Sequence, residues 1–431
     1  MSTTPAAYVH EVFPAAVLED GAPEPRTEAW MQTVSQGFNT EAPTAEAARR
    51  RAAWLVEEGA VLRAVHPVEG REGVDGLGRP VATFVRTEGT VNLGGAELVP
   101  ARMYTSVTVR PAHRRRGILR TMMEAELQAA VDAGFPLAVL TVTEGSIYQR
   151  FGFGTAVRSR SVTVDTGPRF ALHRQPSGRV ESVDAAWLEP RVGELFERFH
   201  ARTVGSVTRR AGWSRYFTEA DGETRARGVR AAVHLDDDGT IDGFVAYTAK
   251  GEFEARELQV HELVAGSDDA YRGLWQHLAA IDLAATATLE AAPLNGPLQY
   301  ALVDQRVVRT TEVYDDLWAR VLDPVAVLRS RGYGPLARAA GLELRLGVRD
   351  ALGHAAGVFA VRPHVDGVDA SRVDGGAQLE LDVSDLGALL FGNAATTLAA
   401  AGRIDELEPG AIALADGLFA VPGGTYFQSH F

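Results

Sequence analysis

A basic loop at residues 107–117, VTVRPAHRRRG, carries the side chains best suited to bind an anion. The β-rich run 103–109 leads into it, and a helical pattern follows it. The first N–H groups of a helix have no partner within the helix, and the helix dipole makes them attractive to negative charge. The arginines 114–116 add positive charge, and Gly117 lets the backbone approach a bulky anion. These features predict a cradle for a pyrophosphate group.

The same loop has two weaker interpretations, as a solvated surface loop or as an RNA-binding patch. Lys plus Arg number 43 against 56 Asp plus Glu, so the net charge is −13. Such a surface repels nucleic-acid phosphates and attracts amines and polyamines, so we expect no nucleic-acid partner. The loop also lacks the G-x-G-x-x-G and GK[ST] patterns, which disfavours NAD and ATP.

The segments around the loop alternate between helical and strand-like patterns. Apolar spacing predicts a helix over 118–133, and good helix formers after a capping threonine predict another over 44–58. Strands are predicted over 60–65, 80–86, 91–99, 103–109 and 136–142, with a turn at Glu88 and Gly89. This order indicates an α/β unit built on a mixed sheet.

A second unit is predicted from about residue 157 to residue 310. Its predicted elements are strands over 231–235, 243–247 and 259–264 and a helix over 269–283. Laying Val264 on Val109 without gaps makes the two strand–loop–helix pieces correspond, which we interpret as a duplication. A chance match of two amphipathic helices is the alternative. The second loop, 266–269, is acidic, so we expect the second copy to have lost the anion site.

Residues 311–431 follow with a different order of elements. We predict strands over 311–318, 342–348, 357–361 and 377–382, and helices over 324–331, 385–391 and 394–401. This order indicates an α+β domain with helices on one face of its sheet. A length of 431 residues suits about three domains.

Composition excludes several other kinds of site. The chain has no cysteine, which excludes disulfides, thiolate metal sites and cysteine nucleophiles. Its 11 histidines are scattered without H-x₃-H or HExxH spacing, so we predict no metal. Residues 1–13 lack the pattern of a signal peptide, and no run of about 18 apolar residues occurs. We therefore expect no membrane span and a cytoplasmic protein.

The loop resembles a known motif. GNAT N-acetyltransferases bind the pyrophosphate of acetyl-CoA through R/Q-x-x-G-x-G/A, and the chain reads RRRGIL from Arg114, with Leu119 in place of the final small residue. Downstream, TEGSIYQRFGF from Thr143 places Tyr148 ahead of a Gly–Phe pair. In such enzymes a tyrosine at this place lies close to the sulfur of acetyl-CoA.

Three features together are more specific: HRRRGILRTMM, TEGSIYQRFGFG and a C-terminal aromatic residue. Their combination resembles the enhanced intracellular survival (Eis) family of acetyltransferases, and the resemblance extends over the whole chain. It implies an α/β (α+β) fold with two fused GNAT-like domains on mixed sheets, at 1–156 and 157–310, the second without a cofactor site. It also implies a sterol-carrier-protein-like α+β domain at 311–431.

The same resemblance implies acetyl transfer from acetyl-CoA to amines, typically those of aminoglycosides at several positions. Polyamines and protein lysines are the alternative acceptors, and a homohexamer is the implied assembly. The resemblance also implies a set of residue roles: the pantetheine-pairing strand at Val107 and Val109, the pyrophosphate loop at Arg114, Arg115 and Gly117, a hydroxyl at Thr143, the general acid Tyr148, and the C-terminal carboxylate of Phe431 as general base.

The proposed acid suits its task better than the proposed base. A phenol with a pKa near ~10 can protonate a departing thiolate with a pKa near ~8.5. An α-carboxylate, with a reference pKa of about 3.3–3.7, is a weak base unless it is desolvated or mainly orients the ammonium while water takes the proton. The alternatives are that Tyr148 only packs at the start of a helix and that Phe431 is frayed and idle.

Two rival functions remain. A related enzyme would acetylate protein lysines or a small metabolite. A non-enzymatic module would sense acyl-CoA with a degenerate GNAT fold, or carry a lipid in residues 311–431. The arginine loop, Tyr148 and the C-terminal aromatic residue are all present, which favours the enzyme.

Overall fold

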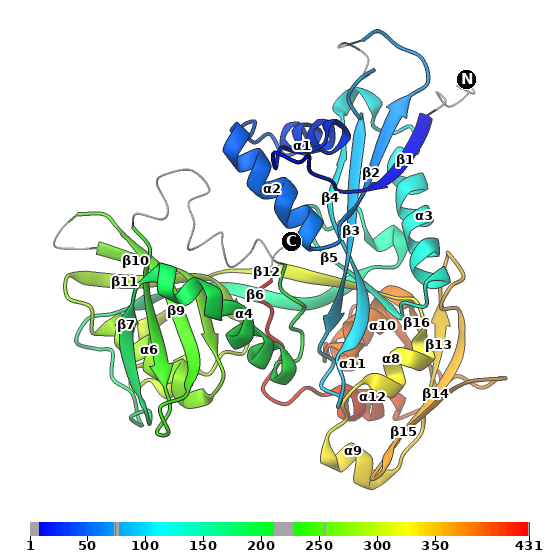
Figure 1. The fold of residues 1–431 in the computed structure, drawn as a ribbon. Coiled ribbons are helices and arrows are strands. Elements are labelled where there is room, and N and C mark those ends of the chain that lie inside the picture. Colours follow the sequence, from blue (N-terminus) through cyan, green and yellow to red (C-terminus); the bar gives the residue numbers. More distant parts are fainter. Residues whose placement is uncertain (1–7, 73, 75–76, 211–227, 253–255, 430) are drawn as a thin grey trace.

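The computed structural model describes residues 8–431 apart from 73, 75–76, 211–227, 253–255 and 430, and in them two β-sheets (Figure 1). The larger sheet has twelve strands in the order β1-β2-β3-β4-β5-β12-β6-β11-β10-β9-β8-β7. These strands are β1 (Tyr8–Pro14), β2 (Val61–Pro67), β3 (Ala82–Val91), β4 (Val99–Val109), β5 (Leu137–Thr141), β6 (Gly154–Asp165), β7 (Arg179–Val183), β8 (Arg230–Leu235), β9 (Ile241–Lys250), β10 (Arg256–Ala265), β11 (Ala284–Pro293) and β12 (Val308–Val321).

Strands β1 to β5 and three helices form what we call the first unit. Helices α1 (Pro25–Gly37) and α2 (Ala45–Glu57) cover one face of these strands, and α3 (Ile118–Asp132) covers the other. Successive side chains of a strand point to opposite faces of the sheet, and two neighbouring residues of β3 show this: Phe84 packs with α3, and Val85 packs with α1 and α2. Both faces of this part of the sheet are therefore buried.

The predicted helices of this unit are confirmed, and one predicted turn is wrong. Thr44 caps α2 by accepting a hydrogen bond from the N–H of Ala47. The turn expected at Glu88 and Gly89 does not form, because β3 runs through both residues. A Cβ on Gly89 would lie 2.5 Å from the sulfur of Met103, so this glycine marks a close approach between neighbours within the sheet.

Strands β7 to β11 form the second unit, with helices α4 (Ala185–Arg202) and α6 (Asp268–Ala279) on opposite faces. In each unit the strand before the crossing helix pairs in parallel with the strand after it, β4 with β5 and β10 with β11. This shared topology confirms the duplication. The gapless alignment is wrong beyond the strands, because residues 110–117 separate β4 from α3 whereas only 266–267 separate β10 from α6.

The long strands β6 and β12 lie at the centre of the sheet and pair with each other. β6 follows the first unit in the chain but pairs with β11 of the second unit. β12 follows the second unit but pairs with β5 of the first. The two units therefore exchange their last strands, and β12 borders the end of β5.

The remaining residues form a five-stranded sheet in the order β15-β14-β13-β16-β17. Its elements are α8 (Pro324–Ser330), α9 (Pro335–Ala340), β13 (Leu344–Arg349), β14 (Gly357–His364), β15 (Gly367–Val373), β16 (Leu379–Asp382), α10 (Val383–Leu390), α11 (Ala395–Ala400), β17 (Ile404–Glu406) and α12 (Ala411–Phe419). Leu344, Leu346 and Val348 of β13 face the helices, and Arg345 and Arg349 lie on the other face. The predicted α+β arrangement is confirmed, with α9 and α12 as additional helices. The strand predicted over 311–318 is part of β12 and belongs to the larger sheet instead.

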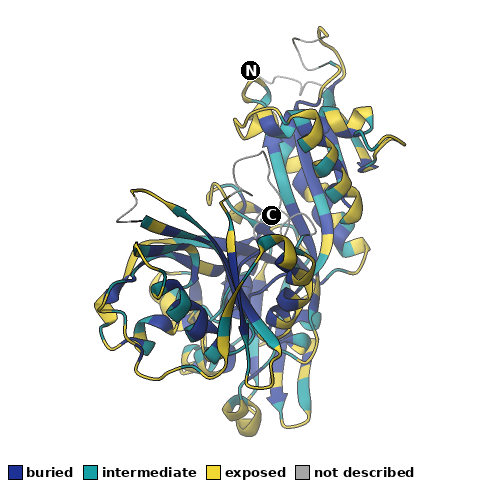
Figure 2. Cartoon of the chain, turned by 60° about the vertical axis from the view of Figure 1, so that its left-hand side comes forward, coloured by how far each residue is buried: buried dark blue, intermediate teal, exposed yellow. Residues whose placement is uncertain are grey.

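Buried residues follow the strands through all three parts of the molecule, while most helices expose their outer faces and α10 is buried throughout (Figure 2). The core of the third part is continuous with that of the first unit, since Val91 and Leu137 belong to the same cluster as Leu386 and Leu389. Within the described residues, no helix combines the length and apolar character needed to cross a membrane.

Candidate active site

Strands β4 and β5 pair over only part of their length. Residues 101–104 pair in parallel with residues 137–140. β4 then continues to Val109 along β3, while β5 ends at Thr141. Among the described residues, no strand pairs with residues 105–109 on the β5 side. Backbone polar groups on this edge are therefore available to an amide-bearing ligand.

A β-bulge in β4 coincides with the point where the two strands part. Ser106 and Val107 lie opposite the single residue Phe84 of β3. Ser106 has a φ of 52°, and its carbonyl accepts a hydrogen bond of 2.9 Å from the hydroxyl of Thr83. A bulge bends its strand and re-aims the side chains beyond it.

One hydrophobic cluster brings together Val107, Val109 and Tyr148, three of the residues predicted from the sequence. Tyr148 is 8% exposed and precedes a short 3₁₀ helix. Its ring makes an edge contact with Phe153, with 6.3 Å between centroids. Burial raises the pKa of Tyr148 to about 12, and the charge of Glu144 adds to the rise. The phenol therefore stays protonated at neutral pH and can act as a proton donor.

Residues 110–117 leave the amino end of α3 open. Gly117 occupies the N-cap position with a φ of 81°, and no side chain of the described residues caps the helix there. Arg115 also has a positive φ, 60°. The side chain of Arg114 donates through Nε to the carbonyl of Val109 over 3.2 Å. Arg114, Arg115 and Gly117 thus surround an exposed, uncapped and positively charged helix terminus.

Tyr8 of β1, which belongs to none of the motifs in the sequence, contacts two residues of this loop. Its hydroxyl lies 3.0 Å from Nδ1 of His113 and accepts a hydrogen bond of 3.3 Å from Arg116. β1 is an edge strand far from the loop in sequence, so no local pattern signals this contact. Arg116, which has no role in the motif resemblance, is held against β1.

Phe431 lies at the end of β5. The hydroxyl of Thr141 donates a hydrogen bond to the main-chain oxygen of Phe431. The Phe431 ring packs partly buried on the core and contacts Phe427 edge-on, with 6.3 Å between centroids. Thr143, predicted to bind the cofactor, lies in the exposed segment after β5. Thr141, for which no motif predicts a role, is in contact with Phe431.

A carboxylate lies close to this junction on β12. Leu317 pairs with Thr141, which places Asp315 beside the residues that follow β5. Oδ2 of Asp315 is 3.5 Å from the position that a Cβ on Gly145 would occupy. It also accepts a hydrogen bond of 2.7 Å from Nε1 of Trp318, a member of the cluster around Tyr148. A cationic group entering here meets negative charge.

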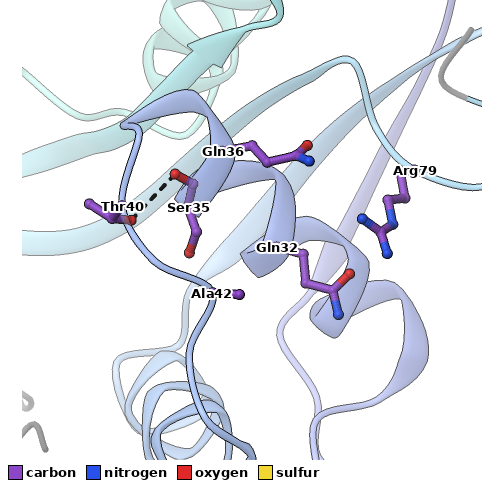
Figure 3. A pocket seen from close by; sticks show the side chains of 6 residues that line it. All are labelled: Gln32, Ser35, Gln36, Thr40, Ala42 and Arg79. Atoms are coloured by element: carbon purple, nitrogen blue, oxygen red, sulfur yellow. Dashed lines mark hydrogen bonds between the residues drawn. The ribbon is translucent and has the colours of Figure 1, made fainter. Parts of the chain in front are cut away.

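A pocket on the opposite side of the first unit has different chemistry. It lies beside α1, which packs on the other face of β4 from α3, and Figure 3 shows its lining residues: Gln32, Ser35, Gln36, Thr40, Ala42 and Arg79. None of these six side chains is a carboxylate, and one is a cation, so we assign no amine binding to this pocket. The described part of the chain also contains no group of three or more side chains placed to hold a metal.

Comparisons with known proteins fit this arrangement. Residues 22–156 and 205–321 each match an Acetyltransferase (GNAT) domain family, and residues 324–428 match the Sterol carrier protein domain family. An uncharacterized N-acetyltransferase of Streptomyces avermitilis is 34% identical over 368 residues, 82% of this chain and 86% of the relative. N-acetyltransferase Eis of Mycobacterium tuberculosis is 30% identical over 388 residues, 86% of this chain and 92% of the relative. The crystal structure of Eis1 from Mycobacterium abscessus has a TM-score of 0.79 and 27% identity, covering 94% of this chain and 97% of that one.

Proposed function

Because the chain belongs to the Eis family of N-acetyltransferases and contains GNAT acetyltransferase domains, we propose that it acetylates the amines of polycationic small molecules, aminoglycosides above all, at several positions. Acetyl-CoA is the proposed donor. The observation that carries the proposal is the hydrogen bond from Thr141 to Phe431 at the end of β5. This bond holds the main-chain oxygen of Phe431 at the end of β5, which supports a role for its carboxylate in the transfer.

The donor site is proposed to follow β4 from its bulge to the loop before α3. The open α3 terminus and its exposed arginines fit a pyrophosphate group, because both supply donors and positive charge. The unpaired β4 edge fits an amide-bearing pantetheine arm. The residues that we propose for this site are Val107, Val109, Arg114, Arg115, Gly117 and Thr143.

Two groups are proposed to move protons during the transfer. The Phe431 carboxylate orients the ammonium of the acceptor and promotes loss of its proton. The neutral amine then forms the N–C bond to the acetyl carbonyl as the C–S bond breaks, and Tyr148 protonates the departing thiolate. Burial supports the role of Tyr148, since it keeps the phenol protonated, and the hydrogen bond from Thr141 supports the role of Phe431, since it fixes the main-chain end of that residue.

The preference for polycations is supported by charge. Glu144 acts electrostatically on Tyr148, Asp315 lies beside Gly145, and the chain carries a net charge of −13. Recognition by charge tolerates acceptors of different shape, which suits acetylation at several positions. Polyamines and protein lysines share the ammonium group, so they are the second class of acceptor that the site would take.

A direct test measures CoA release with a thiol reagent, using acetyl-CoA and a panel of kanamycin, neomycin, spermidine and a lysine peptide. The chain has no cysteine, so the protein adds no thiol background. We expect turnover with several aminoglycosides and little with the peptide. Turnover with the peptide alone would favour the protein-lysine function. Acetyl-CoA binding without turnover on any amine would favour the acyl-CoA-sensing module.

Assembly and location extend the proposal. We propose a cytoplasmic homohexamer, with domain limits after residues 156 and 310. Sedimentation equilibrium against the monomer mass of 46.2 kDa tests the assembly. A lipid-binding role for residues 311–431 is the remaining alternative, and a fluorescent acyl-chain probe distinguishes it, because saturable probe binding is not expected of the acetyltransferase.

A further inference from the structure

The segment 425–429, which precedes the last residues of the chain, bonds to the second unit at two places. The N–H of Tyr426 donates to the carbonyl of Val204 over 2.9 Å. The hydroxyl of Tyr426 donates to the carbonyl of Ala291, on β11 of the second unit, over 3.0 Å. The segment is therefore attached by its backbone and by a side chain before it reaches β5.

Two polar side chains closer to Phe431 continue this attachment. Nε2 of Gln428 donates to the carbonyl of Leu263, on β10 of the second unit, over 2.6 Å. The hydroxyl of Ser429 donates to the carbonyl of Val207 over 3.0 Å. Val207 in turn forms an antiparallel bridge with Val91 of β3 in the first unit. Gln428 and Ser429 thus lie between carbonyls of two segments that are far apart in sequence.

Apolar side chains also pack around the same segment. Phe427 is fully buried in the largest core cluster. The ring of Tyr426 meets Phe199 of α4 edge-on, with 5.6 Å between centroids. A Cβ on Gly205 would lie 3.0 Å from that of Thr425, so the two backbones approach closely. A chain terminus is normally frayed, and this one is enclosed.

A buried ion pair fixes the two segments that receive Gln428 and Ser429. Arg209 and Glu262 form a salt bridge with side chains 6% and 4% exposed. Glu262 precedes Leu263, and Arg209 follows Val207 by two positions. The Arg209 guanidinium also lies 4.0 Å over the ring of Phe196. The pair therefore holds β10 and the segment around Val207 at a set separation.

We propose that the second unit is a clamp that sets the position of Phe431 against Thr141, with Gln428 and Ser429 as positioning residues. This inference rests on the proposed function, since it takes the Phe431 carboxylate to act in acetyl transfer. It assigns a role to a unit in which Ser267 caps α6 by accepting a hydrogen bond from the N–H of Ala270, so that its helix terminus is less open to a cofactor than that of α3. A base acts only within hydrogen-bond reach of its proton, so displacement of the segment lowers turnover.

The test combines Gln428→Met and Ser429→Ala in the full chain. We expect kcat to fall about tenfold while the KM for acetyl-CoA changes by less than about twofold, because the clamp does not touch the α3 loop. Amide hydrogen exchange in the peptide covering residues 425–431 should become fast. Gln276→Met, at a surface glutamine of α6 bonded to Gln175, is the matched control and should change neither readout. Unchanged exchange and unchanged kcat would overturn the clamp.

A glycine added after Phe431 separates this inference from the proposed function. It moves the carboxylate but leaves Gln428 and Ser429 in place, so exchange in residues 425–431 should stay slow while kcat falls. Slow exchange with full turnover would refute the terminal base and leave the clamp standing. Fast exchange in the glycine-extended chain would show that the carboxylate itself anchors the segment, and would overturn the assignment to Gln428 and Ser429.

Discussion

The connection from β4 to α3 and the connection from β10 to α6 occupy equivalent places in two units of the same topology, yet one is open and the other is closed. In the first unit, residues 110–117 end at Gly117 and leave α3 uncapped. In the second, residues 266–267 suffice, and Ser267 accepts a hydrogen bond of 3.0 Å from the N–H of Ala270. At least one of the N–H groups left open in the first unit therefore has its counterpart occupied in the second.

The two connections also differ in charge. Ser267 donates to Asp242 over 2.6 Å, and Asp242 contacts His234 at 2.5 Å, so the second connection is tied into the unit by side chains. Asp268 and Asp269 occupy the first turn of α6 and would repel a phosphate. The anion site is therefore a property of the connection between strand and helix, which a duplication can lose while keeping the sheet.

Removing the phenol of the first unit should have the largest effect. Tyr148→Phe deletes the proposed proton donor, so we expect kcat to fall about a hundredfold or more with the KM for acetyl-CoA unchanged. Steady-state CoA release measures both constants. Tyr247→Phe is the matched control, because Tyr247 is also buried and burial raises its pKa, but it lies on β9 of the second unit. Equal losses in the two variants would refute a special role for Tyr148.

Removing the loop charges should come next. The double variant Arg114→Gln, Arg115→Gln is expected to raise the KM for acetyl-CoA about tenfold. The loss of two buried charge-assisted hydrogen bonds would raise it more, but both side chains are exposed and solvent and salt weaken their effect. The wild-type KM should rise with ionic strength, and that of the variant should rise less steeply because Arg116 remains. Arg272→Gln removes an arginine paired with Asp269 in α6 and should leave this KM unaltered. The same salt dependence in the loop variant and the wild type would place the anion elsewhere.

The contrast between these two connections could be anticipated only in part from sequence. The basic and acidic compositions are local, so the residues of the two loops alone distinguish the open connection from the closed one. The length difference is not visible in a gapless match, because amphipathic helices tolerate a shift by several residues. The predicted turn at Gly89 is wrong for a related reason: glycine signals both turns and close packing, and only the neighbouring Met103 decides between them.

Contacts between distant segments were the least predictable part of the site. Tyr8 meets His113 because β1 lies at the sheet edge, and Thr141 meets Phe431 because the last segment crosses both units. No periodic pattern in the sequence predicts either contact. The helix α12 did carry a signal, since its buried residues Ala411, Ala415 and Leu418 follow helical spacing.

The next prediction concerns His200, which lies where the two units meet. His200 of α4 is 5% exposed, lies 2.8 Å from the hydroxyl of Thr90 on β3, and burial lowers its pKa to about 4. Below pH 6.5 the unfolded chain binds a proton that the folded chain resists, so stability is lost as the pH falls toward 4. Between pH 7 and pH 5 this residue should contribute a loss of about 2 kcal/mol in the free energy of unfolding. Urea unfolding of wild type and His200→Gln at both pH values measures it. The same pH dependence in both proteins would show that His200 does not couple the units to pH.

The smallest effect is expected from replacing the glycines at the two ends of α3. This comparison distinguishes backbone strain from ligand binding. Gly117 before α3 has a φ of 81° and Gly134 after it has a φ of 77°, and a Cβ at either position meets no atom within 4 Å. Alanine at either site should therefore lower the free energy of unfolding by a similar amount, about 1 kcal/mol, through backbone strain alone. Only Gly117→Ala should also raise the KM for acetyl-CoA, because it turns the open N–H groups away from the proposed pyrophosphate. Urea unfolding and CoA release on the two variants test both statements. An equal KM in both would mean that the open terminus, which distinguishes the first unit from the second, does not bind the donor.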